Sequence, residues 1–432
     1  LKLFWLKAQD QQCVPEAPRE LADPFIAMPL AALINVTAKN GMLINNISAV
    51  ATATGGNSSL SDTAAASPPW WEPDSFGFAL VVALVSTACW GSWSNTAKAA
   101  GSCMNFAHFY TDFCLGTLLA ALVFFVGPGM SHPGWPEVDF ARCLFALAAG
   151  AVFGVANLLL TTGVALAGLS IAFPLCIGTG LVLGTVLTYL VDRRGQPALL
   201  FPGVFLALLG VLANAKAYAA LHKSRQSGAT EGNPHLESSG DESGDGGTPD
   251  SETSASSSST SAVPPAPSAA RNVVMCIIAG VLMGCWAPLS TKSMKGQEGL
   301  SPYFSFLCYT VASMTIGMAI IGGQQCGVAV VPRIGAITSA REYFGLPIAL
   351  HGWGLLGGTV WAVGTISNLV SGGPLGFALS YALGQTAPVV AVLWGLFLYH
   401  EFDGAPRESV VSLVAMFLFF ALAITLLCLG GR

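Results

Sequence analysis

Residues 75–97 read SFGFALVVALVSTACWGSWSNTA, an apolar run without a charged side chain. A helix of about 20 apolar residues crosses the roughly 30 Å of hydrocarbon in a bilayer. Over the whole chain 53% of the residues are hydrophobic and 9% are charged, whereas soluble domains are about 25% charged. So little charge cannot cover a water-soluble protein of this size. The composition therefore predicts an integral, multi-pass protein of the plasma membrane or an endomembrane.

Nine further segments follow the same pattern, and the sequence predicts about ten transmembrane helices. Lipid offers no hydrogen-bond partner to a peptide group, so each apolar segment is expected to be helical. The predicted fold class is therefore an all-α, polytopic membrane protein. The ten segments are 75–97, 106–127, 143–165, 169–191, 202–221, 272–292, 303–322, 350–370, 373–399 and 408–430.

Two stretches fall outside this pattern and divide the chain. Residues 1–74 form a poorly defined N-terminal tail, which is a candidate extracytoplasmic segment. Residues 222–270 are rich in Ser, Gly, Pro, Asp and Glu, and such a composition cannot bury enough apolar surface to offset its chain entropy. We expect an acidic, Ser-rich, disordered linker there. It separates a first five-helix repeat at 75–221 from a second at 271–432.

The two halves resemble each other in sequence. Trp90 in the first span is matched by Trp286 in the sixth, and Asn157 in the third span is matched by Asn368 in the eighth. Because each half has five spans, the second half enters the membrane from the opposite face. Such inverted repeats allow alternating access to a site near the bilayer midplane. Chance similarity between short apolar strings is the alternative explanation.

Backbone features inside the spans predict close contacts and kinks. Gly150 and Gly154 have the spacing of small residues that lets two helices approach closely. Pro174 and Pro388 lie inside the fourth and ninth spans, where each removes a backbone hydrogen bond. We expect a kink at each proline, and a carbonyl freed there is a candidate solute ligand.

Polar and aromatic side chains inside the spans are candidate substrate ligands. A polar side chain is costly in lipid, so it is expected to face the interior of the bundle. Amides offer a donor and an acceptor to a polyol, a ureide or a base, and aromatic faces stack on sugar rings and heterocycles. The alternatives are helix-to-helix contacts for the amides, an interfacial belt for the tryptophans and snorkelling for the lysine. The candidates are Trp90, Asn95, Asn157, Thr179, Lys216, Trp286, Asn368 and Gln385.

Asp112 is the candidate for proton coupling. It lies about one turn inside the second span, and His108 lies on the same helical face. A carboxyl group removed from water can carry a proton. The alternative is an interfacial carboxylate that faces the headgroups or pairs with Lys98.

Other classes of protein find little support in the residues. An intramembrane enzyme needs a clustered nucleophile and base or a set of metal ligands, whereas the six histidines are scattered and most of the eleven cysteines lie in apolar runs, where cysteine acts as a small hydrophobe. We therefore expect no enzyme, no metal site and no cofactor. The sequence has no long basic run of the kind that binds nucleic acid. The expected partners are a small polar solute and the lipid bilayer, with protons or sodium ions as candidate coupling ions.

Several motifs together resemble one group of transporters. They are CWGSWSNT at 89–96, YTD at 110–112, GPG at 127–129, AGLSIAFP at 167–174, GTG at 178–180 and the Trp394-Gly395 and Glu401-Phe402 pairs. These motifs resemble the ten-span branch of the drug/metabolite transporter superfamily. Within it the chain is most similar to the group of glucose/ribose porters, rhamnose permeases and plant ureide permeases. The resemblance covers about residues 75–430 without the linker.

The resemblance implies two inverted five-helix repeats and transport of sugars, ureides or nucleobases, often by proton symport. The predicted function is therefore secondary transport of a small polar solute by alternating access, with carbohydrate transport as one form of it. The alternatives are exchange of a nucleotide sugar or another metabolite, and a non-transporting scaffold or receptor that acts through the linker. Ureide permeases are described with a phosphate-loop-like motif in the linker. Residues 222–270 contain no GxxxxGK[ST], so nothing there supports ATP binding.

Overall fold

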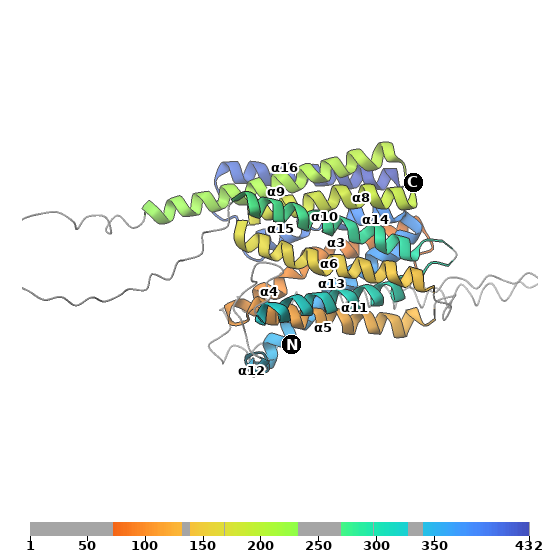
Figure 1. The fold of residues 1–432 in the computed structure, drawn as a ribbon. Helices are drawn as coiled ribbons and strands as arrows, with labels where there is room; N and C mark the ends of the chain where they lie inside the picture. The colour runs from red at the N-terminus through yellow and green to blue at the C-terminus, as the bar shows by residue number, and fades with distance from the viewer. Residues whose placement is uncertain are drawn as a thin grey trace, which may run out of the picture.

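The computed structural model describes residues 72–131, 139–167, 169–231, 269–296, 298–326 and 340–431. Every regular element in these ranges is helical. Long helices lie side by side in one bundle (Figure 1). The predicted all-α, polytopic fold class is thus confirmed. The predicted N-terminal tail lies almost wholly outside the described residues.

In the first half, the helices follow the five predicted spans. Trp93 separates α3 from α4, and a π-helical turn at Pro174 separates α7 from α8. The elements are α3 (Phe76–Ser92), α4 (Ser94–Ala100), a 3-10 turn (Gly101–Cys103), α5 (Phe106–Phe124), a π turn (Phe125–Gly129), α6 (Phe140–Ala167), α7 (Leu169–Phe173), a π turn (Pro174–Gly178), α8 (Thr179–Asp192) and α9 (Pro197–Glu231).

The second half has the same plan. Its fourth span is also interrupted, because α14 ends before Gln385 and α15 begins at Pro388. The elements are α10 (Ala269–Met294), α11 (Pro302–Gln325), the short α12 (Ala340–Gly345), α13 (Ile348–Leu375), α14 (Phe377–Gly384), α15 (Pro388–Phe397) and α16 (Arg407–Gly430). The linker predicted at 222–270 is shortened at its start, since α9 continues to Glu231.

Nine helical segments among the described residues are long and apolar enough to cross a membrane. The predicted span that is not among them, 350–370, corresponds to α13, which has 28 residues. At 1.5 Å per residue this length also suffices to cross a bilayer. Because α13 packs against both α5 and α3, most of its Gly, Ser, Thr and Asn residues, among them Thr365, Asn368 and Ser371, face protein rather than lipid.

The ends of the helices gather at two faces of the bundle. At one of them, the α12 face, Lys98 of α4 and Arg225 of α9 both donate to Glu401, which follows α15. At the other, the C-terminal face, the backbone N–H of Gln196 donates to Gly430 at the end of α16. Figure 1 shows α12 and the C-terminus at opposite ends of the bundle.

The two halves cross the bundle in opposite directions. The first span of the first half ends at the α12 face, where Lys98 lies. The first span of the second half ends at the C-terminal face, because Lys295, directly after α10, pairs with Asp192 at the end of α8. This is the topology predicted for inverted repeats.

The helix contacts repeat when the halves are exchanged. Helix α10 packs on α6 as α3 packs on α13, and α11 packs on α6 as α5 packs on α13. Helix α9 packs against its own counterpart, α16. A two-fold axis between the halves, lying in the plane of the membrane, produces this pattern.

Glycines allow the closest of these contacts. A Cβ atom on Gly150 of α6 would lie 1.9 Å from the carbonyl oxygen of Tyr309 on α11, and one on Gly358 of α13 would lie 1.9 Å from that of Phe113 on α5. Gly154, one turn along α6, also lies against α11. The close approach predicted from the spacing of Gly150 and Gly154 is confirmed.

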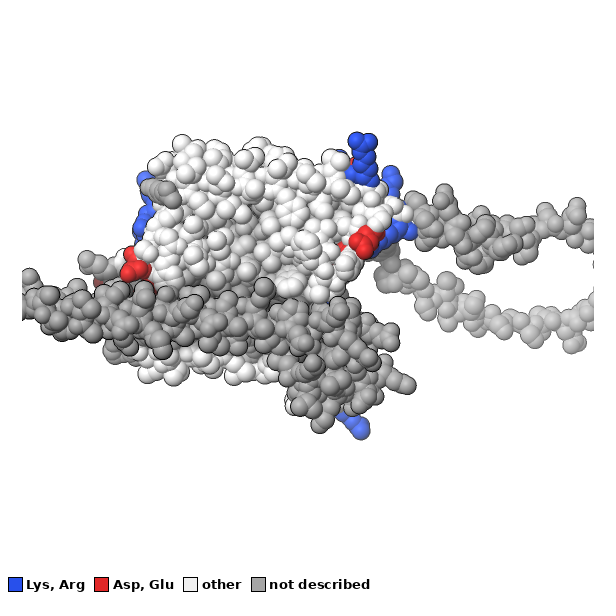
Figure 2. Space-filling model, turned by 180° about the vertical axis from the view of Figure 1, so that it is seen from behind, with Lys and Arg blue, Asp and Glu red and all other residues white. Residues whose placement is uncertain are grey.

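Charged side chains lie at the two ends of the molecule, and an uncharged band separates them on the side shown in Figure 2. Large hydrophobic side chains are exposed along the helices, among them Val123, Phe205 and Leu418. A soluble protein would bury such side chains, whereas a bilayer covers them. The molecule is therefore an integral, multi-pass membrane protein, as predicted.

We predict that Gly358→Ala destabilises the protein and that Gly373→Ala on the same helix does not. The new methyl group at 358 meets the backbone of α5, whereas a Cβ at 373 has no atom within 4 Å. Overpacking of this kind costs about 1–3 kcal/mol. Thermal unfolding in detergent measures the difference as a Tm several degrees lower for Gly358→Ala. Equal Tm values for the two variants would show that this helix contact does not limit stability.

Candidate functional site

Aromatic side chains from both halves meet in the interior of the bundle. Trp286 is 2% exposed, and its ring centroid lies 6.1 Å from that of Trp90, 5.8 Å from Tyr309 and 5.6 Å from Tyr381. Trp361 stacks on Tyr309 with centroids 6.1 Å apart and an interplanar angle of 15°. We call this group the central aromatic cluster; its members are Trp90, Phe153, Trp286, Tyr309, Trp361 and Tyr381.

The two tryptophans that repeat in sequence lie in contact with each other. A residue can touch its own counterpart only near the axis that relates them. The Trp90–Trp286 pair therefore marks the position of the two-fold axis, about midway along α3 with α4 and along α10. The central aromatic cluster is thus built around the axis, where both halves contribute to one site.

Several buried polar atoms near this cluster have no hydrogen-bond partner among the described residues. They include the hydroxyl of Tyr309, the hydroxyl of Ser290 one turn beyond Trp286, and Nδ2 of Asn95. An unpaired buried polar group costs about 1–3 kcal/mol, so such groups are rare without a reason. A polar atom of a bound solute is one partner that satisfies them.

The interrupted spans of the two halves meet beside the cluster. The Tyr381 hydroxyl of α14 donates to the carbonyl oxygen of Gly180 on α8 at 3.0 Å. At the end of α14, the Leu383 carbonyl accepts the hydroxyls of Thr87 at 3.0 Å and Thr386 at 2.6 Å. Both prolines lie at breaks in the α-helix, and the Gly384 carbonyl, which Pro388 leaves without its helical partner, accepts the backbone N–H of Ala387 at 3.1 Å.

The two candidate amides have different surroundings. Asn368 is 4% exposed. Its side-chain Nδ2 donates to the backbone carbonyl of Ser380 at 2.7 Å, and its backbone carbonyl accepts the Ser380 hydroxyl at 2.7 Å. It therefore joins α13 to α14, which is the helix-contact role given as the alternative. Asn157 is half-buried, and its side chain hydrogen-bonds with that of Tyr110.

The structure pairs Asn157 with a different residue from the one that the sequence repeat suggested. Gly150 of α6 and Gly358 of α13 make equivalent contacts, so they occupy equivalent positions. Counting seven residues on from each glycine makes Thr365, not Asn368, the counterpart of Asn157. Thr365 accepts a 3.1 Å hydrogen bond from Nε1 of Trp90. The residue at this position of α13 is thus a hydroxyl that bonds to Trp90, whereas Asn157 in α6 bonds to Tyr110.

The other candidates divide between interior and surface. Thr179 begins α8 and lies against Gly280 of α10, and Gln385 is buried at the break between α14 and α15. Lys216 lies on the outside of the bundle, where Nζ is 3.4 Å from Oε1 of Glu408 and both side chains are exposed. The structure does not bring Lys216 to the central aromatic cluster.

Asp112 forms a separate buried cluster under α12. It is 1% exposed; Oδ2 lies 2.7 Å from Nδ1 of His351 on α13, and Oδ1 accepts the hydroxyl of Tyr343 on α12. Burial, and then the hydrogen bond to Asp112, raise the pKa of Tyr343, so Tyr343 remains a donor. The possible pairing of Asp112 with Lys98 is wrong, because Lys98 pairs with Glu401.

Sequence reasoning did not select His351, Tyr343, Tyr309 or Trp361 as candidates. Each lies far along the chain from its partner, so no local spacing connects them. The available signal was that Tyr309, His351 and Trp361 lie inside predicted spans. Among the described residues, the buried side chains that can carry charge are Asp112, Asp192 and His108, and no Lys or Arg is buried.

Fold and site together define a polytopic α-helical membrane protein with an interior polar and aromatic site on a two-fold axis. The family model for ureide permeases matches residues 109–262. Ureide permease 1 of Arabidopsis thaliana is 24% identical over 349 residues, which are 74% of this chain and 88% of that protein. Ureide permease 4 of the same plant is 23% identical over 80% of this chain and 94% of its own length, and ureide permease 2 is 22% identical over 81% and 95%.

These similarities support a relationship to the ureide permease family, which is a family of transporters. The relatives' names describe them as permeases, and permeases are membrane transporters. The family model and the relatives together cover spans of both halves, so the similarity does not rest on one apolar segment.

We predict that His351→Gln lowers stability, because it weakens the bond to the buried Asp112 carboxylate. A hydrogen bond to a charged group is worth about 1.5–3 kcal/mol. His400→Gln is the matched control, since His400 pairs with Asp403 at 3.6 Å but both side chains are exposed. Thermal unfolding in detergent should show a Tm several degrees lower for His351→Gln alone. If the two variants unfold at the same temperature, the Asp112 cluster contributes nothing to the fold.

Proposed function

We propose that the protein is a secondary transporter of a small, uncharged, ureide-type solute, which it moves by alternating access. The observation that carries this proposal is the central aromatic cluster on the two-fold axis, with the unpaired hydroxyl of Tyr309 inside it. The similarity to ureide permeases supports the same class of solute.

The cluster suits a flat polar molecule. Aromatic faces stack on planar rings, and each such contact is worth about 0.5–1.5 kcal/mol beyond burial. A ureide carries alternating N–H and C=O groups along its edges. The hydroxyls of Tyr309 and Ser290 and the amide of Asn157 offer donors and acceptors to such edges. We therefore assign substrate binding to Trp90, Trp286, Tyr309 and Asn157, with Asn95, Thr179 and Gln385 at the border of the site.

Charge argues for a neutral solute over an anionic one. An exchanger of nucleotide sugars needs basic side chains against phosphate. In the part of the chain that the structure describes, Lys98 pairs with Glu401 near the α12 face and Lys216 pairs with Glu408 outside. No Lys or Arg among these residues is buried. This supports a ureide, a nucleobase or a sugar as the solute.

Uptake into vesicles tests the proposal directly. Purified protein in liposomes is offered radiolabelled allantoin, uracil and glucose as the ureide, nucleobase and sugar probes, with and without an inward proton gradient. We expect saturable accumulation of allantoin. No uptake of any probe above protein-free liposomes would overturn the proposed function, and uptake of glucose alone would replace the ureide by a sugar.

We predict that Tyr309→Phe raises KM for the transported probe about fivefold, since one hydrogen bond is worth about 1 kcal/mol. The ring stays in place, so the fold is preserved. Tyr189→Phe is the matched control, because Tyr189 packs against Phe201 of α9 outside the cluster. A KM that is unchanged in Tyr309→Phe would remove this hydroxyl from the binding site.

Asp112 and His351 are proposed to couple transport to protons. Carboxyl and imidazole groups inside the membrane are the side chains that form proton relays in transporters, and here Nδ1 of His351 lies 2.7 Å from Oδ2 of the buried Asp112. We predict that Asp112→Asn abolishes the stimulation of uptake by a proton gradient while exchange of internal for external solute persists. Stimulation that survives in Asp112→Asn would exclude this cluster as the coupling site.

A further inference from the structure

Two ion pairs occupy equivalent places at the two faces. At the α12 face, Nζ of Lys98 lies 2.6 Å from Oε1 of Glu401. At the C-terminal face, Nζ of Lys295 lies 3.5 Å from Oδ1 of Asp192. In each pair the lysine ends the first span of one half, and the acid ends the fourth span of the other half. Each pair therefore connects the two halves: the lysine comes from the first half in one pair and from the second half in the other.

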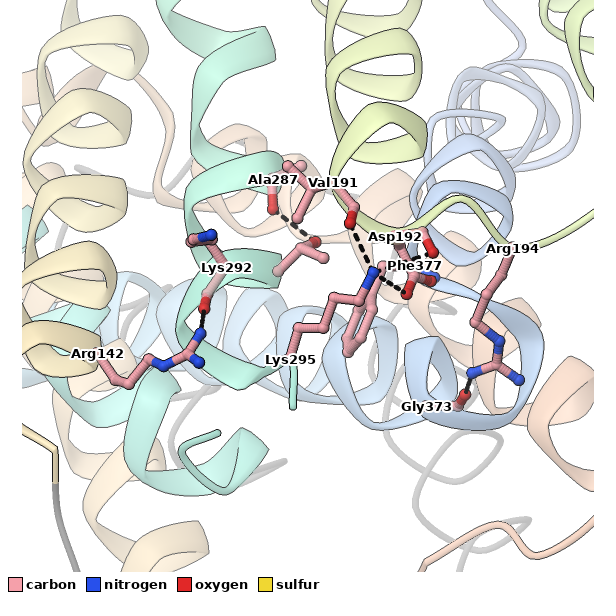
Figure 3. Close-up of polar contacts among 10 residues, drawn as sticks. Arg142, Val191, Asp192, Arg194, Ala287, Lys292, Lys295, Gly373 and Phe377 are labelled. Carbon is pink, nitrogen blue, oxygen red and sulfur yellow. Dashed lines mark hydrogen bonds and ion pairs between the residues drawn. The ribbon is translucent and has the colours of Figure 1, made fainter. Parts of the chain in front are cut away.

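Asp192 is the centre of the contacts at the C-terminal face (Figure 3). It is buried, and its Oδ2 accepts the backbone N–H of Phe377 at 3.2 Å. Lys295 also donates to the carbonyl oxygen of Val191 at 2.6 Å. Beside them, Arg194 donates to the carbonyl oxygen of Gly373 at the end of α13. These contacts join α8, α10, α13 and α14 at this face.

Glu401 is the centre of the contacts at the α12 face, as Asp192 is at the C-terminal face. Its Oε2 accepts the Tyr218 hydroxyl at 2.9 Å, and its backbone oxygen accepts Nη2 of Arg225 at 2.6 Å. Nζ of Lys98 also lies 4.2 Å from the ring centroid of Tyr399. Burial, and then the charge of Glu401, raise the pKa of Tyr399 to about 12. Tyr399 is therefore uncharged, and Glu401 is the acidic partner of Lys98.

We propose that these two ion pairs are paired latches, each of which holds one face closed and releases when that face opens. The inference rests on the proposed transport function. Rocking the halves about the axis separates the first and fourth spans at one face and presses them together at the other. Both pairs are formed in this structure, and the inference assigns it to a state that is closed at both faces.

The strength of the pairs fits this role. Exposed ion pairs contribute little because water and salt screen them, and the side chains of Lys98 and Lys295 are 48% and 42% exposed. Such a contact holds a face closed without locking it. A permanent structural tie between the halves would be expected to have both partners buried.

The test measures access to the interior from each side of the membrane. Cys285 is half-buried and lies close enough to Tyr381 of the central aromatic cluster to interact with it electrostatically, so its modification reports whether the site is reachable. Sealed vesicles of each orientation are treated with a membrane-impermeant maleimide, and mass spectrometry quantifies labelling of Cys285. A C-terminal epitope tag identifies vesicles in which the C-terminal face is exposed. Labelling needs no solute, so the result is independent of what the protein transports.

We expect opposite shifts in the two neutral variants. Glu401→Gln should raise labelling of Cys285 from the α12 face about two- to fivefold and lower it from the C-terminal face. Asp192→Asn should do the reverse, and its amide oxygen still accepts the Phe377 N–H. Lys216→Gln is the matched control, since its pair with Glu408 does not connect the first and fourth spans. Lys98→Gln and Lys295→Gln replace the acid variants if either acid variant does not fold.

The outcomes separate this inference from the proposed function. Labelling that changes equally at both faces, or not at all, in folded variants overturns the latches even if uptake of allantoin is normal. Opposite shifts in a protein that takes up none of the probes support the latches and overturn the solute assignment. The exchange Lys98→Glu with Glu401→Lys should restore the original labelling, and failure to restore it also counts against an ion-pair latch.

Discussion

The hydrocarbon of the bilayer offers no partner to a polar group, and the remaining features follow from this constraint. Every peptide group in the band must bond within its own helix, and polar side chains are driven into the interior. Helix α13 shows the consequence most directly. Its Gly, Ser, Thr and Asn content makes it too polar to face lipid, so α3 and α5 flank it. Enclosure of the most polar helix places Trp361, Thr365 and Asn368 beside the two-fold axis.

The sequence predicted the spans well because the hydrophobic signal is local. Each of the ten apolar runs coincides with a helical segment, although the fourth and ninth are interrupted and α9 extends beyond its predicted span. The Trp90–Trp286 repeat located the axis. It predicted side-chain surroundings less well. A helix in lipid is apolar all round, so periodicity does not show which face is buried. Lys216 was therefore misplaced toward the interior, and the pairing of Asp112 with His351 depends on residues far apart in the chain.

The two halves have equivalent helices, but many equivalent positions on these helices hold different side chains. The glycine contacts of Gly150 and Gly358 fix how α6 corresponds to α13. That correspondence places Thr365 opposite Asn157 and leaves Asn368 to join α13 with α14. Matching letters in the sequence thus identified the right helices and the wrong pair of side chains. Packing against a neighbouring backbone tolerates little change, whereas equivalent polar positions can hold different groups with different partners: Thr365 bonds to Trp90, and Asn157 bonds to Tyr110.

The same correspondence shows where the two halves differ chemically. Phe113 of α5 corresponds to Tyr309 of α11, so the preceding residue, Asp112, corresponds to Cys308. Gly150 of α6 corresponds to Gly358 of α13, and the same difference in residue number makes Cys143 the counterpart of His351. Cys143 and Cys308 contact each other, so the place held by Asp112 and His351 near one face is held by two thiols near the other. A symmetric scaffold supplies two equivalent closed arrangements, but it cannot by itself favour one direction of movement. Within the proposed mechanism, the Asp112–His351 pair, whose counterparts are Cys308 and Cys143, supplies the difference that a proton gradient can act on.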